Sequence, residues 1–364
     1  MKEKKTETRY VGIDLGKRTY QMAIVDKKGK VKMSGGKTYV AARQSMYRKL
    51  NPSDKVALEA GATAFTIAKE IEAAVGCKVF VLNPGRLAII YKSMKKTDKE
   101  DALKIAHMLQ DFQEERLPIV PVPSDKEMNR RKLVAGCKRA QQYRNRSINQ
   151  LHGLFLLQGI TTIVKEDLAT SENRSEAIKI LIGLELEEAK YLLKCLELYE
   201  ERIRNLDKKI EEESADDEQI EILKSIPGVG PKTSFAFVSH VAAERFENAS
   251  QVSNYLGLVP RVYMSGDTAR YGRITKRGNG YLRALLVQSS WALVRSRNGG
   301  KLKQRYEYMT REKSISKKKA IVAIARRLAE LMYTLMKYEA KYLCLPLLIE
   351  KKEVYPKKQF AKCA

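Results

Sequence analysis

Short apolar runs and amphipathic stretches follow one another through the first 120 residues. One run, Tyr20–Val25, alternates apolar and polar positions and meets a turn at residues 27–29, as the second strand of a hairpin does. Further along, residues 64–75 carry a helical pattern, and another helix is expected over 98–109. The predicted strands are residues 10–15, 20–25, 55–59 and 78–82. Strands and helices in this order predict an α/β domain with a mixed sheet.

A proline-rich segment closes this domain. Residues 117–123 contain three prolines, so they cannot be helical and make a domain boundary. From about residue 124 to 213 the pattern is helical, and near its end the apolar positions alternate spacings of three and four. These positions are Ala189, Leu192, Leu196, Tyr199, Ile203, Leu206 and Ile210. They form the a/d pattern of a coiled coil, or equally of one helix in an antiparallel bundle.

An acidic stretch at residues 211–218 precedes a third region, which opens at Ile226–Gly230 and is mainly helical to about Tyr342. The lysines beyond it predict a basic tail. We therefore expect four parts: an α/β domain at 1–122, a helical or coiled-coil linker at 123–218, a mainly helical domain at 219–345, and the tail at 346–364.

The charge of the chain indicates a polyanionic partner. Its 364 residues include 69 Lys and Arg against 43 Asp and Glu, which gives a net charge of +26 and a pI near 9.7. A folded protein with this surplus repels itself unless a polyanion neutralises it, so nucleic acid is the expected partner. We expect no membrane association, because no apolar run approaches 18 residues. The polar first ten residues do not resemble a signal peptide.

The few cysteines and histidines narrow the possible chemistry. The five cysteines are odd in number and scattered, which favours reduced thiols and a cytoplasmic location over disulfides or a zinc site. Only three histidines are present, so carboxylates are expected to do the catalytic work.

Four carboxylates stand out by position. Asp14 and Glu59 each close a predicted strand, and Asp98 and Asp101 begin a predicted helix. A spacing of three puts the last two on one helix face, where they can share a divalent ion. Such oxygen ligands suit Mg²⁺ or Mn²⁺. Alternatively, Asp98 is only a helix N-cap and Asp101 a favourable first-turn acid.

The sequence around these carboxylates resembles a known family. The segments Gly12-Ile-Asp14-Leu-Gly16, Leu58-Glu59-Ala-Gly61 and Lys96-Thr-Asp98-Lys-Glu-Asp101-Ala102 are similar to the D-E-D-D set of one bacterial insertion-sequence transposase family. That family has an RNase H-like N-terminal domain, similar to the Holliday-junction resolvase RuvC, and includes the Piv DNA invertase. The resemblance covers residues 9 to about 340. It implies that Asp14, Glu59, Asp98 and Asp101 are metal ligands.

The third region opens with a possible phosphate contact. Residues 223–234 resemble a helix-hairpin-helix, in which Gly228 and Gly230 allow a tight turn and Lys232 follows. The free N–H groups of such a turn, beside a helix N-terminus, can hold a DNA phosphate. The alternative is a plain glycine turn between packed helices.

Residues 256–283 are rich in glycine and cations, as phosphate-binding loops are, and they include Arg273, Lys276 and Arg277. The segment resembles the second signature of the same family, in which a Ser-Gly pair supplies the nucleophile. This implies that Ser265 is the nucleophile. Some members carry the serine one place earlier, where this chain has Met264.

The helical middle carries Arg139, Arg144 and Arg146, as a helix that follows a phosphate backbone does, although a solvated basic face looks the same. The resemblance further implies a structured guide RNA from the same genetic element.

Together these features predict a transposase that cuts and exchanges strands of double-stranded DNA as a dimer or tetramer. We expect the a/d seam to join two chains, with Ser265 of one facing Asp14 and Asp98 of the other. The main alternative is a structure-selective nuclease that uses metal-activated water and forms no covalent intermediate. An actin-like ATPase needs a second glycine-rich phosphate loop, which residues 30–120 lack. A non-catalytic nucleic-acid scaffold is the fourth possibility.

Overall fold

The computed structural model describes residues 7–90, 97–265 and 268–343. The chain forms two compact units that divide between Ser124 and Asp125, two residues from the predicted boundary. Each unit is considered by itself. Within the described residues, no helix is long and apolar enough to cross a membrane.

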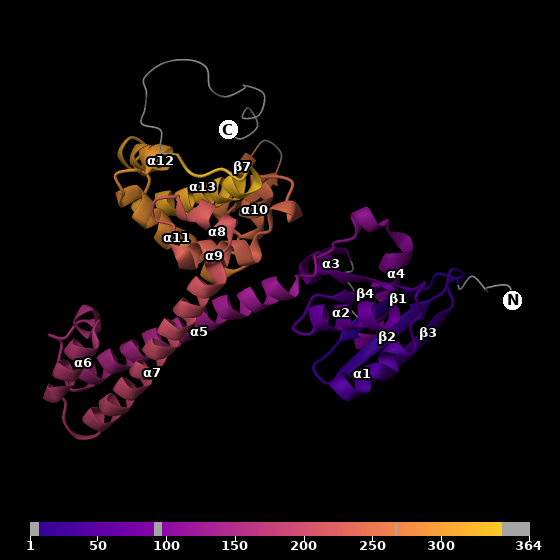
Figure 1. The fold of residues 1–364 in the computed structure, drawn as a ribbon, viewed down its shortest axis with the longest axis horizontal. Helices are drawn as coiled ribbons and strands as arrows, with labels where there is room; N and C mark the ends of the chain where they lie inside the picture. Colours follow the sequence, from indigo (N-terminus) through magenta and orange to yellow (C-terminus); the bar gives the residue numbers. More distant parts are fainter. Residues whose placement is uncertain (1–6, 91–96, 266–267, 344–364) are drawn as a thin grey trace, which may run out of the picture. The chain divides into compact units, whose positions relative to one another are not determined.

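The first unit is built on a five-stranded mixed sheet with the order β3-β2-β1-β4-β5 (Figure 1). Strands β1, β2 and β3 pair antiparallel, whereas β4 and β5 continue parallel to β1. The strands are β1 (Tyr10–Leu15), β2 (Thr19–Val25), β3 (Val31–Lys37), β4 (Lys55–Glu59) and β5 (Lys78–Leu82). The four predicted strands are therefore confirmed. Strand β3 was not predicted, because it is a mostly exposed edge strand with no apolar run.

Helices cover both faces of this sheet. Its alternate residues fall into separate apolar clusters, one with α1 and α2 and another with α4. The helices are α1 (Val40–Tyr47), α2 (Ala64–Val75), α3 (Pro84–Ile90) and α4 (Asp98–Asp111), followed by a short 3-10 turn at Glu114–Arg116. Helices α2 and α4 were predicted and are confirmed. The sheet therefore has a buried core on each side, and its strand ends remain available for a site.

The second unit contains a long arm made of two antiparallel helices, α5 (Asp125–Leu157) and α7 (Gly183–Ser214), with α6 (Ser171–Ala177) near its far end (Figure 1). Short 3-10 turns at Lys165–Leu168 and Ile178–Ile180 flank α6. The antiparallel order follows from paired contacts, since Arg144 bonds to Glu200 while Gln158 bonds to Ile182.

The predicted a/d seam packs within one chain. Ala189, Leu192 and Leu196 are buried together with Leu151 and Phe155 of α5. Farther along, Leu206 and Ile210 are buried with Val134, Cys137 and Ala140 of α5. The expectation that this seam joins two chains is therefore wrong. The helix α5 of the same chain already covers these apolar side chains.

The rest of the second unit is mainly helical, as predicted. Its helices are α8 (Glu218–Lys224), α9 (Pro231–His240), α10 (Ala249–Tyr255), α11 (Gly280–Arg295), α12 (Gly300–Arg311) and α13 (Lys317–Lys337), with a 3-10 turn at Ala243–Arg245. One apolar core joins them to the base of the arm. The predicted glycine-rich loop contains a two-stranded hairpin, β6 (Pro260–Ser265) and β7 (Thr268–Ile274). The predicted basic tail lies outside the described residues.

Candidate active site

Two of the four predicted carboxylates stand at the ends of neighbouring parallel strands. Strands β1 and β4 pair up to Ile13 and Leu58, and Asp14 and Glu59 are the next residues along each strand. Because parallel strands end at the same edge of a sheet, both carboxylates lie at that edge. The carboxyl ends of strands are also where open α/β sheets bind their ligands.

The other two carboxylates lie in the first turn of α4. The hydroxyl of Thr97 caps this helix by accepting a hydrogen bond from the backbone N–H of Glu100 at 3.3 Å. Asp98 is thus the first helical residue, and the alternative that it is only the N-cap is wrong. Helix α4 lies directly on β1, because a Cβ at Gly12 would stand 2.1 Å from the carbonyl oxygen of Ala102. This close approach brings the first turn of α4 toward the end of β1.

The charges of the other three carboxylates affect the pKa of Asp14. The pKa of Asp14 is raised to about 6, and burial is the largest cause. The remaining causes that raise it are the negative charges of Asp98, Asp101 and Glu59, in that order. Like charges gathered at a half-buried position disfavour the ionised form of Asp14 unless a cation is present.

The chemistry of this donor set fits a hard divalent cation, because Mg²⁺ and Mn²⁺ prefer carboxylate oxygens. Within the described ranges, however, no three Asp, Glu, His or Cys side chains gather closely enough to hold an ion as they stand. One oxygen of Asp101 pairs with the ammonium of Lys104 at 3.0 Å. Coulombic effects extend farther than coordination bonds, so Asp98, Asp101 and Glu59 can affect the pKa of Asp14 without lying at coordination distance from it.

The predicted nucleophile belongs to the second unit. Ser265 is the last residue of β6, and its backbone pairs with Thr268 across the turn of the hairpin. Gly266, the second residue of the Ser-Gly pair, lies outside the described residues. Arg270 and Arg273 on β7 are exposed. The hairpin therefore carries Ser265 at its tip and cations along its second strand.

The basic loop after β7 is held by close backbone contacts. A Cβ at Gly257 would stand 2.0 Å from the carbonyl oxygen of Arg277, and Lys276 adopts a left-handed backbone conformation with φ of 55°. The backbone of the loop thus packs closely against the residues that follow α10. The predicted phosphate contacts Arg273, Lys276 and Arg277 all have exposed side chains.

His240 and Asn279, neither of which was predicted as a site residue, anchor this loop. The Nδ2 of Asn279 donates to Nε2 of His240 at 2.9 Å, while Nδ1 of His240 donates to the carbonyl oxygen of Ala236. The Oδ1 of Asn279 also caps α11 by accepting from the N–H groups of Tyr281 and Leu282. Burial lowers the pKa of His240, which favours the neutral ring that this arrangement needs. Their sequence separation of 39 residues gave no local signal.

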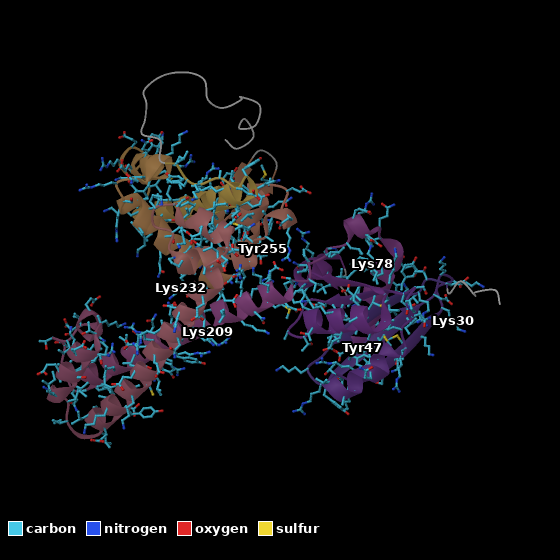
Figure 2. The ribbon with its side chains drawn as sticks, viewed as in Figure 1. Lys30, Tyr47, Lys78, Lys209, Lys232 and Tyr255 are labelled. Carbon is cyan, nitrogen blue, oxygen red and sulfur yellow. The ribbon has the colours of Figure 1, made fainter. Side chains whose placement is uncertain are left out.

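The predicted helix-hairpin-helix is a turn between α8 and α9. Gly228 has φ of 82°, and a Cβ there would stand 2.6 Å from the backbone nitrogen of Leu293 in α11. This glycine is therefore required by packing. Gly230, at the N-cap of α9, has open space beside it. Lys232 lies near the base of the arm (Figure 2) and pairs with Asp207 of α7 at 2.8 Å, so its charge already has a partner within the chain.

The predicted arm cations fall into two groups. Arg139 and Arg146 are exposed and, within the described part of the chain, take part in no ion pair. Arg144 differs, because its Nε donates to Glu200 at 2.9 Å, and buried Arg174 holds the other oxygen of the same carboxylate at 2.8 Å. Arg144 is thus part of a structural ion network that joins α5, α6 and α7.

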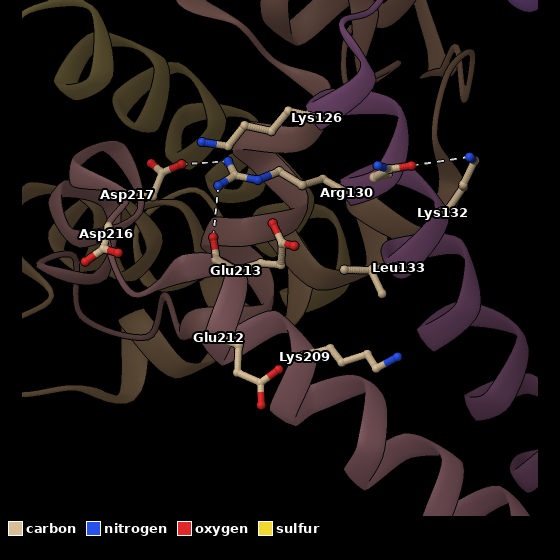
Figure 3. A pocket seen from close by; sticks show the side chains of 10 residues that line it. Lys126, Arg130, Lys132, Leu133, Lys209, Glu212, Glu213, Asp216 and Asp217 are labelled. Carbon is tan, nitrogen blue, oxygen red and sulfur yellow. Dashed lines mark hydrogen bonds and ion pairs between the residues drawn. The ribbon is translucent and has the colours of Figure 1, made fainter.

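A hollow of about 740 Å³ lies at the base of the arm (Figure 3). Buried Arg130 crosses it, donating to Asp217 at 2.6 Å and to the carbonyl oxygen of Glu213. None of the predicted site residues lines this hollow. Its paired charges join α5 to the end of α7 and the start of α8, which is a structural role.

Two family models match the two ends of the chain. A transposase model of the DEDD IS110 type matches residues 11–161, which contain all four carboxylates. A second, described as "Transposase IS116/IS110/IS902 family", matches residues 220–307, which contain Ser265 and the basic loop. The chain belongs to the IS110/IS116 family of DEDD transposases. It is therefore a DNA transposase, and its DEDD domain implies dependence on a divalent metal ion. The five-stranded mixed sheet is consistent with the RNase H-like fold expected of this domain.

Several relatives of this transposase match over most of its length. A "Probable family 20 transposase" of Pseudomonas aeruginosa is 28% identical over 300 residues, covering 78% of this chain and 84% of that protein. The "Transposase for insertion sequence element IS1111A" of Coxiella burnetii is 25% identical and covers 93% of this chain and 92% of its own. A "Pilin gene-inverting protein" of Moraxella bovis is 25% identical over 71% of this chain and 73% of its own.

Proposed function

We propose that this transposase cuts and exchanges DNA strands with Ser265 as the nucleophile and with Mg²⁺ or Mn²⁺ at Asp14, Glu59, Asp98 and Asp101. The observation that carries the metal part is geometric: Asp14 and Glu59 end neighbouring parallel strands, and α4, whose first turn contains Asp98 and Asp101, packs directly on β1. The raised pKa of Asp14, caused first by burial and then by the three other carboxylates, supports it. A cluster of this kind opposes folding unless it serves to bind a cation. The Ser265 part rests on its place at the tip of a basic hairpin and on the family signature around it.

The proposed reaction has two balanced steps. The hydroxyl oxygen of Ser265 forms a bond to a DNA phosphorus, the bond from that phosphorus to a deoxyribose oxygen breaks, and the serine proton passes to a base while the deoxyribose oxygen gains one. A deoxyribose hydroxyl of another strand then loses its proton to a base and attacks the same phosphorus. The bond from phosphorus to the Ser265 oxygen breaks, that oxygen regains a proton, and a DNA diester is restored. The divalent ion, when bound, supplies positive charge near the oxygens that become negative.

We propose that nucleic acid is held by exposed cations of the second unit. Arg273, Lys276 and Arg277 would contact DNA phosphates near Ser265, and the open turn at Gly230 would add backbone N–H groups. Arg139 and Arg146 on the arm would contact a structured guide RNA. Lys232 and Arg144 contribute less to this proposal, because each is already paired within the chain.

The decisive experiment separates covalent catalysis from hydrolysis by water. A nicked DNA substrate that traps the intermediate should yield a denaturation-resistant adduct with the unchanged protein. Ser265→Ala should retain DNA and metal binding, form no adduct and cut no DNA. Ser289→Ala is the matched control, since Ser289 is buried in α11 and should not affect the adduct. Cleavage by the Ser265→Ala protein would overturn the serine mechanism and support the nuclease alternative.

A further inference from the structure

The hairpin β6–β7 exposes an aromatic side chain on each of its strands. Tyr263 of β6 is 60% exposed and Tyr271 of β7 is 71% exposed. Residues 260–274 also contain three Arg against one Asp. Exposed rings interleaved with cations are typical of surfaces that bind a single nucleic-acid strand, because bases stack on the rings while the cations contact phosphates.

The backbone register divides the two tyrosines between the faces of the hairpin. Tyr263 pairs with Arg270 across the two strands. The neighbouring pair, Val262 and Tyr271, lies on the opposite face, because successive residues of a strand alternate between faces. Ser265 follows Tyr263 by two residues, so its position is on the same face as Tyr263. We call Tyr263 and Arg270 the flanking pair.

The ring of Tyr263 is seated against the hairpin, and Arg270 forms no ion pair with the described residues. A Cβ at Gly272 would stand 3.4 Å from Cε2 of Tyr263, so the ring packs beside a residue of β7 that has no side chain. The guanidinium of Arg270 is exposed and carries a positive charge that a phosphate can neutralise. The flanking pair thus offers a base-stacking surface and a phosphate contact side by side.

The spacing along the hairpin fits one strand of DNA. A β-strand rises about 3.4 Å per residue, so the flanking pair lies about 7 Å from the position of Ser265 along β6. Successive phosphates of one DNA strand are about 3.4 Å apart along the helix axis. The flanking pair can therefore reach a nucleotide within about two steps of the phosphate that Ser265 attacks.

We propose that the flanking pair binds an unpaired nucleotide beside the cut, with Tyr263 stacked on its base and Arg270 on its phosphate. This inference rests on the proposed role of Ser265. Strand exchange opens base pairs at the cut, because each strand end changes its partner, and an opened base is available to stack on a side chain. Stacking accepts every base, so the contact holds the strand end without reading its sequence. Tyr271, on the opposite face, does not contact this nucleotide.

Affinity measured with Ser265→Ala protein tests this contact without relying on cleavage. The probe is a duplex that spans one end of the insertion element, with its base pairs opened around the cut, together with RNA transcribed from that element. Tyr263→Val keeps a residue that favours strands but removes the ring, and it should weaken binding about tenfold. Tyr263→Phe should restore the affinity. Tyr271→Val is the matched control and should leave the affinity unchanged, and circular dichroism shows whether each variant is folded.

An abasic nucleotide tests whether the ring of Tyr263 meets a base. Moved through the opened stretch, it should weaken binding about tenfold at one position when Tyr263 is present. With Tyr263→Val it should cause no further loss there, because the stacked contact is already gone. Arg270→Gln and a neutral methylphosphonate should be non-additive in the same way at a phosphate next to that position.

Two results would overturn the proposal. One is an abasic nucleotide that weakens binding equally at every position whether residue 263 is Tyr or Val. The other is a loss of affinity for Tyr271→Val as large as that for Tyr263→Val. If the coupling is found but the unchanged protein forms no covalent adduct with DNA, the serine mechanism fails and the contact of the flanking pair stands.

Discussion

Asp14 occupies a position in the first unit that disfavours its ionised form. It is half-buried at the end of β1, and this burial, together with the charges of three further carboxylates, raises its pKa to about 6. Compared with the unfolded chain, the folded state therefore favours the protonated form of Asp14. A structural ion pair has the opposite effect, because it favours the ionised form of a carboxyl group. An acid held in this way lowers stability at neutral pH, so its presence points to a role in binding cations.

We predict that Asp14→Asn stabilises the metal-free protein at pH 8 while abolishing DNA cleavage. The destabilisation by Asp14 begins above its ordinary pKa of 3.8 and is complete above about 6, so the gain should be smaller at pH 5. A shift of about two units corresponds to about 3 kcal/mol, and solvent screening at a half-exposed group reduces the expected gain to about 1 kcal/mol. Calorimetry without divalent ions measures it. The exposed Glu115→Gln should change neither property, and a lower unfolding temperature for Asp14→Asn at pH 8 would contradict the clustering.

His240 gives the basic loop a second pH dependence. Its neutral ring accepts a hydrogen bond from Asn279, and burial lowers its pKa below the ordinary 6.5. The unfolded chain therefore binds a proton more readily, so this contribution is full above pH 6.5 and falls as the pH decreases. We predict one histidine resonance with a pKa below 6.5, which disappears in His240→Gln. Since the chain has only three histidines, NMR resolves it directly. A pKa at or above 6.5 would show that the ring is not held neutral.

At the scale of single residues, the sequence predicted those site residues that a local pattern marks. Asp14 and Glu59 were recognised because each closes an apolar run, and Asp98 and Asp101 because of their helical spacing. The hydrogen bond between His240 and Asn279 was not predicted, because it depends on how α9 and α11 pack. Sequence also could not distinguish Arg144, held by Glu200, from its exposed neighbours.

Among the elements, apolar periodicity succeeded wherever one face is buried. Helices α2 and α4 and four strands agree with their predicted positions. Strand β3 was missed because its glycines and exposed lysines leave no apolar face, and the hairpin β6–β7 because it lies on the surface. The a/d seam of α7 was correctly recognised as a helix-packing surface. Periodicity states that a face is buried but not which helix buries it, and here that helix is α5.

The helix α5 allows phosphate contacts to be separated from structural cations. We predict that Arg139→Ala and Arg146→Ala each weaken RNA binding and reduce the slope of log affinity against log salt by roughly one unit. Arg144→Ala is the matched control, because its loss should lower stability through Glu200 and leave the slope unchanged. Binding titrations from 50 to 200 mM salt, about the range over which such contacts weaken strongly, measure this. If all three variants have the same slope of log affinity against log salt, Arg139 and Arg146 face solvent and do not contact RNA phosphates.

At the scale of the whole molecule, the predicted catalytic groups are divided between the two units. The carboxylates belong to residues 7–124 and Ser265 to residues 125–343. The strong positive charge predicted a nucleic-acid partner, and membership in the transposase family agrees with it. Residues 151–200, which include the far end of the arm, contain five Lys and Arg against nine Asp and Glu, although the whole chain carries a net charge of +26.

This division leads to the last prediction, that one working site draws on two chains. Strand exchange requires two DNA duplexes to be cut together, and each chain supplies one carboxylate set and one Ser265. In a dimer or tetramer, the carboxylates of one chain and Ser265 of another would form one shared site. Mixing Asp14→Asn chains with Ser265→Ala chains should then restore activity, because a mixed dimer would combine the intact carboxylates of one chain with the intact serine of the other. Strand exchange on labelled DNA measures the recovery.

The same mixture distinguishes the opposite arrangement. If each chain completes its own site, every site in a mixed dimer lacks either Asp14 or Ser265, and the mixture stays as inactive as each variant alone. Co-purification through two different affinity tags establishes that mixed dimers have formed. Inactivity of these dimers then shows that each chain completes its own site. A mixture with Asp14→Asn and Ser265→Ala on the same chain, plus unchanged chains, is the control. In a shared dimer site these mixed dimers retain no competent centre, whereas with separate sites they retain one. The two mixtures thus give opposite results under the two arrangements.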